Sequence, residues 1–266
     1  MTKHAFFLAL CAALALSGQT RQERGKKVID DALAALGGER FLQMRDRVEA
    51  GRAYSFYREQ LSGLSRATIY TRYLTRPEPP QRGFFGVRER QNFGKKEEYG
   101  VLFADGKGYD ISFRGARPIS DGVVSRFTET TRRNVLYILR MRLGEPGLIF
   151  EWQGSDVYEN QPVDIVDITD GDNLTTTVYF HQTTKLPVRQ TFIRRDPKTK
   201  ERFEEVTLFS KYRDVGGGVQ WPFAIQRFRD EEKIYEIYSE SVVINQNLPD
   251  NMFMLGGNVK ILKPAR

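Results

Sequence analysis

The side chains of this sequence that could do chemistry are mostly carboxylates. Adjacent acidic pairs stand at Glu97–Glu98, Glu204–Glu205 and Glu231–Glu232. Neighbouring residues of a strand point to opposite faces, so none of these pairs places two carboxylates at one site. A glycosidase-type reaction would need two carboxylates brought together from distant segments. A secreted, carboxylate-dependent hydrolase therefore stays an alternative that depends on the fold.

Metal and nucleophile chemistry is limited by the scarcity of cysteine and histidine. Cys11 is the only cysteine, and His4 and His181 are the only histidines. Cys11 and His4 fall in a segment that we expect to be cleaved, which leaves His181 alone in the mature chain. Such a chain can form neither a disulfide nor a Cys/His zinc site, and a Ser-His-Asp triad would have to use His181. We expect no catalytic residue, no metal site and no cofactor.

The acidic segment DITDGDN resembles half of a calcium-binding loop. It contains Asp167, Asp170, Asp172 and Asn173. A calcium loop carries a glutamate at its twelfth position, and Val178 stands there instead. We interpret the segment as a solvated hairpin turn.

The formal charge of +7 over 266 residues raises the question of an anionic partner. Basic residues alternate with Asp and Glu in nearly every expected strand, and they do not accompany the stacked aromatic cluster of single-strand nucleic-acid binders. We therefore expect no nucleic-acid partner. The excess of basic residues has two possible roles, which are solubility and contact with an anionic surface.

The N-terminal segment MTKHAFFLALCAALALSGQT is typical of a secretory signal peptide. A basic pair, Lys3–His4, precedes an apolar run over Ala5–Leu16, and small residues follow up to Gly18. We predict that residues 1–18 are removed on export to the periplasm, where the mature protein could lie against the outer membrane. Leu10 precedes Cys11 where a lipobox has a small residue, so we expect no lipid on this cysteine.

Helical periodicity appears in two places. The segment KKVIDDALAALGGERFLQM predicts a helix over Lys26–Met44, with Gly37–Gly38 as a stop signal. The segment SRFTETTRRNVLYILRMRL predicts a second helix over Ser125–Leu143, since its apolar residues recur at helical spacing. Gly144 and Pro146 would end it.

Most of the remaining chain alternates with the period of a strand. We expect an α+β fold with about eleven short antiparallel strands in one large curved sheet, in a single domain over residues 25–263. So many strands in one sheet tend to curl, and the inserted helix could cover the concave face that results.

The segment YRDVGGGVQWPFAIQRF shows the alternation most clearly. The glycines Gly216–Gly218 predict a turn, because glycine adopts positive φ without steric cost. The strand after them has one apolar face, which consists of Val219, Trp221, Phe223 and Ile225. Two helices can cover only part of a wide curled sheet, so we predict an apolar trough that holds a ligand. Its predicted wall is completed by Phe150, Trp152 and Leu139.

This arrangement resembles the outer-membrane lipoprotein carrier family, with the LolA/LolB-like fold. The similarity rests on the helix ending in ALGG, on the glycine turn followed by VQWPFAI, and on the terminal pattern N-x-x-L-P-D-x-x-F. The residues of that last pattern are Asn245, Leu248, Pro249, Asp250 and Phe253. The resemblance implies an unclosed β-barrel with helices as a lid, which binds the acyl chains of lipids or of lipoproteins and has no catalytic residues.

The second helix carries arginines at intervals of seven, at Arg126, Arg133 and Arg140. On a regular helix they form a stripe opposite Val135, Ile138 and Leu139. The stripe could meet anionic lipid head groups or an acidic envelope partner, or it could be a solvated face. The sequence therefore favours a lipid or lipoprotein carrier, with an envelope protein-binding module without ligand and a secreted hydrolase as the alternatives.

Overall fold

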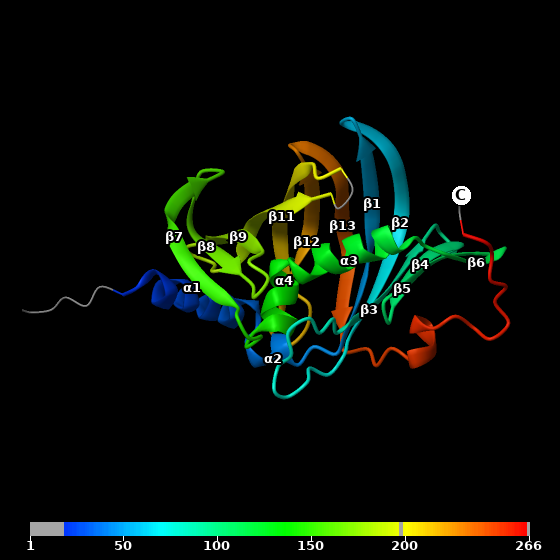
Figure 1. Ribbon diagram of the computed structural model, residues 1–266, viewed down its shortest axis with the longest axis horizontal. Coiled ribbons are helices and arrows are strands. Elements are labelled where there is room, and N and C mark those ends of the chain that lie inside the picture. Colours follow the sequence, from blue (N-terminus) through cyan, green and yellow to red (C-terminus); the bar gives the residue numbers. More distant parts are fainter. Residues whose placement is uncertain (1–18, 197–198, 265–266) are drawn as a thin grey trace, which may run out of the picture.

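The computed structural model describes residues 19–196 and 199–264, so the expected signal peptide and Cys11 lie outside it. Figure 1 shows a wide, curved sheet with helices lying in its curve. The helical elements are α1 (Arg21–Leu36), α2 (Glu39–Leu42), α3 (Asp121–Arg132), α4 (Val135–Tyr137), the π-helical turn η1 (Ile138–Arg142) and the 3-10 turn η2 (Asp250–Phe253). The strands are β1 (Asp46–Tyr57), β2 (Gln60–Tyr73), β3 (Val87–Phe93), β4 (Tyr99–Ala104), β5 (Lys107–Ser112), β6 (Gly115–Pro118), β7 (Ile149–Tyr158), β8 (Gln161–Thr169), β9 (Thr175–His181), β10 (Pro187–Arg195), β11 (Arg202–Asp214), β12 (Gln220–Arg229) and β13 (Glu232–Ile244).

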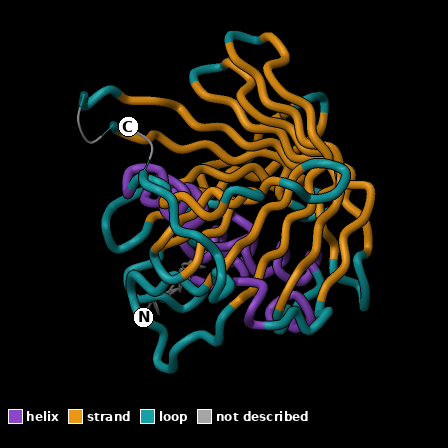
Figure 2. Tube along the Cα trace, turned by 90° about the vertical axis from the view of Figure 1, so that its right-hand side faces the viewer, coloured by secondary structure: helices purple, strands orange, loops and turns teal. Residues whose placement is uncertain are grey.

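The strand order explains why helices cover the concave face. Strands β1 to β6 form one antiparallel meander and β7 to β13 form another, and the two join where β1 pairs with β13. The consecutive strands β6 and β7 are therefore the outer strands of the sheet. The segment that connects them, with α3, α4 and η1, has to cross from one edge to the other. It does so inside the curve of the sheet (Figures 1 and 2).

The α+β class, the curved antiparallel sheet that does not close, and the two helical regions are confirmed. The sheet has thirteen strands, where the sequence predicted about eleven. Strand β6, with the sequence GARP, has no alternating pattern that could reveal it, because only Ala116 is buried. Its outer edge is covered by the C-terminal segment, where the Ala116 backbone N–H donates to Lys260 O at 2.9 Å.

Helix α1 begins earlier than predicted because a capping box precedes it. The Thr20 hydroxyl accepts a hydrogen bond from Glu23 N at 3.1 Å, and the Glu23 carboxylate accepts one from Thr20 N at 2.7 Å. Gly37 takes the left-handed conformation and ends the helix, as predicted. The short helix α2 is separate, so the prediction of one helix over Lys26–Met44 was wrong in merging the two.

Gly25 marks the place where α1 packs on β7. A Cβ atom at this position would lie 2.6 Å from Phe150 O, too close for a side chain to fit without moving the helix. We expect Gly25→Ala to lower the free energy of unfolding by about 1–3 kcal/mol, although alanine favours helices. Gly122→Ala in α3, where a Cβ meets no atom within 4 Å, should instead raise it by about 0.5 kcal/mol. Urea unfolding followed by circular dichroism measures both, and effects of the same sign would contradict this packing.

The predicted glycine turn before β12 is confirmed. Gly216, Gly217 and Gly218 have φ values of 127°, 65° and 86°. The Asp214 carboxylate accepts hydrogen bonds from Gly216 N at 2.7 Å and from Gly218 N at 3.1 Å. The turn reverses the chain from β11 into β12 and so fixes the register of the apolar face of β12.

The terminal pattern N-x-x-L-P-D-x-x-F ties the chain end to the convex face. The Asp46 carboxylate, at the buried start of β1, accepts hydrogen bonds from Gln246 N at 2.6 Å and Leu248 N at 3.2 Å. Leu248 and Phe253 are buried against residues of β2 and β4. The pattern therefore has a structural role on the side of the sheet that faces away from the helices.

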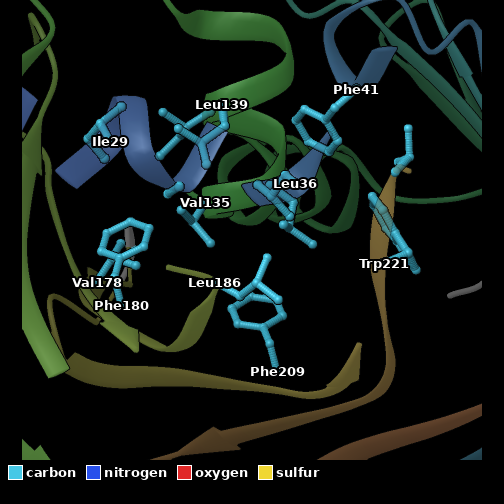
Figure 3. Close-up of a cluster of buried hydrophobic side chains, with 14 of the residues drawn as sticks. Ile29, Leu36, Phe41, Val135, Leu139, Val178, Phe180, Leu186, Phe209 and Trp221 are labelled. Carbon is cyan, nitrogen blue, oxygen red and sulfur yellow. The ribbon is translucent and has the colours of Figure 1, made fainter. Parts of the chain in front are cut away.

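The main hydrophobic core fills one part of the curve, between the helices and strands β8 to β12. Figure 3 shows Ile29 and Leu36 of α1 and Val135 and Leu139 of the connecting segment packed over side chains of the sheet, among them Phe209. This core occupies only part of the concave face. Another part of that face lies beneath α3.

Candidate functional site

A cavity of about 360 Å³ lies between α3 and the concave face, next to the main core. Residues of α3 and α4 form one wall, and strands β1 to β3 and β10 to β12 provide the other. Its main apolar lining residues are Val87, Phe127, Leu136, Tyr137, Trp221 and Ile225. The volume lies at the lower end of that of small-molecule sites, which measure roughly 300–1,000 Å³.

The strand side of the cavity also has a polar network. Arg47 lies over the Trp221 ring, 4.1 Å from its centroid, and its Nε atom is 3.5 Å from the Glu49 carboxylate. Arg47 Nη2 donates to the Thr71 hydroxyl at 3.0 Å, and that hydroxyl donates to Glu89 at 3.3 Å. Burial raises the pKa of Glu89 although Arg47 lies nearby. The predicted trough is therefore apolar only in part.

Helix α3 covers the cavity with few apolar contacts. No residue of α3 is fully buried. Its Phe127 ring stacks on Phe103 of β4, with centroids 3.9 Å apart and planes at 7°, and meets Phe85 edge-on at 5.9 Å. A segment with little buried apolar surface opens at a lower free energy than the core beneath it.

The predicted wall residues divide into three groups. Trp221 and Ile225 line the cavity, whereas Val219, Phe223 and Leu139 are buried in the main core. Phe150 and Trp152 lie on the outer strand β7, partly buried against the same core. Trp152 lines a separate pocket beside α1, where Arg24 lies 4.9 Å from the centroid of its ring.

The predicted arginine stripe was wrong for two of its three residues. The helix breaks at Arg133–Asn134, so the residues after the break no longer continue the face that carries Arg126. Arg133 is buried and donates to the backbone oxygens of Ile193 and Thr175. Arg140 is buried and donates to Met44 O at 2.6 and 3.1 Å. Only Arg126 is exposed, and it lines the cavity.

Two side-chain amides hold the break in place. The Asn134 Oδ1 atom caps α4 by accepting from Leu136 N at 2.9 Å. Gln190 of β10, which is 1% exposed, accepts from Val135 N at 2.8 Å. These bonds satisfy backbone N–H groups at the start of α4 and attach the connecting segment to the sheet.

A buried ionic cluster anchors the end of the connecting segment. Arg142 donates to Glu145 at 2.6 and 3.0 Å and to Asp170 at 3.0 Å, and Arg132 donates to Glu145 at 3.0 Å. Burial alone would raise the pKa values of Glu145 and Asp170, but their hydrogen bonds, those from Arg142 among them, hold both below their ordinary values. The acidic segment is a hairpin turn, as predicted, but Asp170 is buried within it and is not solvated.

His181 has a local structural role. Its Nδ1 atom accepts hydrogen bonds from Thr183 N and Thr184 N, both at 3.1 Å, and so shapes the turn after β9. Within residues 19–196 and 199–264, no three His, Cys, Asp or Glu side chains gather in a way that could hold a metal ion. Among the same residues, none of the helices has the length and apolar character to cross a bilayer.

The residues that the sequence analysis missed are the charged ones inside the cavity. Arg47, Glu49 and Glu89 stand at strand positions that point to the concave face, whereas the apolar residue Val48 points to the convex face and packs near Leu248. The signal was the alternation in β1, where Arg47 and Glu49 occupy alternate positions and so share one face. Charged residues are ordinarily assigned to the solvent side, so this face was not recognised as part of a cavity.

The fold is shared with several solved structures at low sequence identity. Neither a family model nor a curated protein matches the sequence. A domain from Vibrio parahaemolyticus, named for outer membrane lipoprotein sorting, matches with a TM-score of 0.56 at 10% identity, over 87% of this chain and 97% of that one. A DUF1329 family protein from Desulfovibrio piger matches with a TM-score of 0.56 at 12% identity, over 86% and 97% of the two chains. A LolA superfamily protein from Nitrosomonas europaea matches with a TM-score of 0.51 at 11% identity, over 86% and 97%.

Proposed function

We propose that this protein, whose chain has the LolA-like fold, is an exported carrier or binding protein for acyl chains, either of lipids or of lipidated proteins. The observation that carries the proposal is the cavity beneath α3, with Trp221, Ile225 and Leu136 in its wall. The similar protein named for lipoprotein sorting supports it by analogy of fold. The N-terminal sequence supports a place in the periplasm, with the outer membrane as a neighbouring surface.

The expected affinity is that of a carrier. Burial of an acyl chain contributes roughly 0.8 kcal/mol per methylene, so about ten methylenes give on the order of 8 kcal/mol. Lost freedom on association costs about 4–15 kcal/mol, depending on the treatment. The net binding is then modest and reversible. Helix α3, which contacts the sheet through the Phe127 ring and is anchored at its C-terminal end by Arg132, is the element that would open to admit and release the chain.

The hydrolase alternative gains little from the structure. Glu49 and Glu89 do meet at the cavity wall although they come from different strands. Each is already engaged, Glu49 by Arg47 and Ser239, and Glu89 by Thr71 and Gln91. We therefore keep a binding function, in which these carboxylates maintain the wall of the cavity.

A protein-binding module is the second candidate, and one observation favours it. The β1–β2 hairpin carries three exposed apolar side chains, with Tyr57 66%, Leu61 56% and Leu64 59% exposed. Leu61 and Leu64 lie on one face of the hairpin, beside Phe56 and Tyr54, and exposed apolar side chains on one face are typical of an interaction surface. Such a surface is compatible with a carrier that hands its cargo to an envelope partner.

Filling the cavity tests the proposal. Thr130 of α3 lines the cavity, whereas Ser125 lies on the opposite face of the same helix and is exposed. We expect Thr130→Trp to weaken binding of a fluorescent fatty-acid probe at least tenfold, and Ser125→Trp to leave it within twofold, with little change in melting temperature for either. Native mass spectrometry of the wild type should show co-purified lipid. Equal probe binding by the two variants would place the ligand elsewhere.

A further inference from the structure

Arg227 of β12 is a guanidinium inside the cavity that has no acceptor. It is partly buried and lines the cavity, and within the described part of the chain it makes no hydrogen bond or ion pair. Glu205, a carboxylate on the neighbouring strand β11, is already taken, because it accepts from Arg194 at 3.1 Å and from Arg229 at 3.2 Å. Burial lowers the pKa of Arg227, as expected for a cation that has left water without a full replacement.

Thr207 stands beside Arg227 on the same face. The two residues are directly paired across β11 and β12, so their Cβ atoms lie about 4.5–5.5 Å apart. Thr207 also lines the cavity, is 6% exposed, and makes no side-chain hydrogen bond to any described residue. A free hydroxyl next to a free guanidinium can donate to one anionic group together with it.

The helix side of the cavity adds a second unpaired cation. Arg126 of α3 lines the cavity from the opposite wall and forms no ion pair with the residues that the structure describes. The charged groups that line the cavity are three arginines and two glutamates. Arg47 lies within 3.5 Å of Glu49, and Glu89 is held by Thr71 and Gln91. The cavity therefore has a net excess of one positive charge. Its two cations without an ion pair are Arg126 and Arg227.

We propose that the cavity selects single-chain amphiphiles with an anionic head group, which enters the cavity and binds to Arg227 and Thr207 while Arg126 closes over it from α3. This inference rests on the proposed acyl-chain function and names its ligand class. The volume of about 360 Å³ fits one chain better than several. A planar guanidinium binds both carboxylate and phosphate with two parallel hydrogen bonds, so a fatty acid and a monoacyl phosphate present the same chemistry.

The experiment compares three ligands of equal chain length, dodecanoate, dodecyl phosphate and dodecanol, at pH 8 and below their micellar concentrations. Displacement of a fluorescent probe gives the affinities. We expect wild-type protein to bind the anions at least tenfold more tightly than dodecanol. Arg227→Met should lower the affinity for the anions about 10- to 100-fold and leave that for dodecanol within twofold. Arg229→Met is the matched control, because Arg229 lies on the same strand but is paired with Glu205 outside the cavity.

The outcomes separate this inference from the proposed function. Equal wild-type binding of the three ligands would overturn the anion site and leave the acyl-chain function standing, whether or not the variants fold. Binding of none of them would overturn both. A preference for dodecanoate over dodecyl phosphate, or the reverse, would support the site and identify the source of the anion as a free fatty acid or a phosphorylated lipid. Loss of the preference in Arg229→Met as well as in Arg227→Met would overturn the assignment to Arg227.

Discussion

Replacement of Arg142 by methionine is expected to lower the free energy of unfolding by about 3–5 kcal/mol, a large part of the stability of an ordinary domain. Arg142 is 3% exposed and bridges Glu145 and Asp170. Without it, Asp170 has no ion-pair partner among the residues that the structure describes, and Glu145 keeps only Arg132 there. A buried carboxylate that loses its partner has no compensation for the water it gave up. Urea unfolding followed by circular dichroism measures the loss.

The control is an exposed ion pair of the same residue types. Arg52 lies 3.2 Å from Glu240, with side chains 60% and 50% exposed, so Arg52→Met should cost less than about 1 kcal/mol. Acid should imitate the Arg142 variant. The pKa values of Glu145 and Asp170 are lowered in the folded protein, so their contribution is present above about pH 4 and is lost as the pH falls through the folded values. A wild type and an Arg142→Met variant that lose stability in parallel below pH 4 would contradict this assignment.

Truncation of Trp221 to alanine is expected to cost about 3–5 kcal/mol of stability. Trp221 is 3% exposed, packs in the main core and lies under the Arg47 guanidinium. Its loss would leave a void that the paired strands cannot close, and would leave Arg47 without the ring it covers. Because the variant also removes a fluorophore, unfolding should be followed by circular dichroism.

The second tryptophan provides the matched control. Trp152 is only partly buried on the outer strand β7, and its Nε1 atom donates to Asp164 at 3.2 Å near the surface. We expect Trp152→Ala to cost less than half as much as Trp221→Ala. Similar losses for the two variants would mean that β7 belongs to the core as fully as β12 does.

The sequence predicted the fold because its signals are local. The strand after Val219 and the glycine turn before it depend on neighbouring residues alone, and both are confirmed, although Pro222 and Ala224 on the other face of the strand are buried too. The break at Arg133–Asn134 could not be predicted in this way. Asn134 supplies a local cap, but the break is also held by Gln190, which lies more than fifty residues further along the chain and competes with helix continuation for the backbone N–H of Val135.

The candidate site was less accessible to prediction than the fold. Trp221 and Ile225 were predicted to form a ligand wall only because they occupy alternate positions of one strand. Both line the cavity, but their role in binding stays a prediction. The charged residues Glu49, Glu89 and Arg227 belong to three strands, β1, β3 and β12, whose side chains line one cavity only after the sheet curls. Single-strand patterns carry no information on which charges will face one another across a cavity.

The seam between β1 and β13 has a consequence for how the chain folds. Within each meander, every strand pairs with its neighbours in sequence, so these contacts are of low contact order. At the seam, Arg47 pairs with Ile244, and about three quarters of the 266-residue chain lies between them. The closure of so long a loop has the largest entropic cost of any strand pairing in the sheet. We infer that the two meanders form independently and early, and that the joining of β1 to β13 is the step that limits the rate at which the sheet becomes complete.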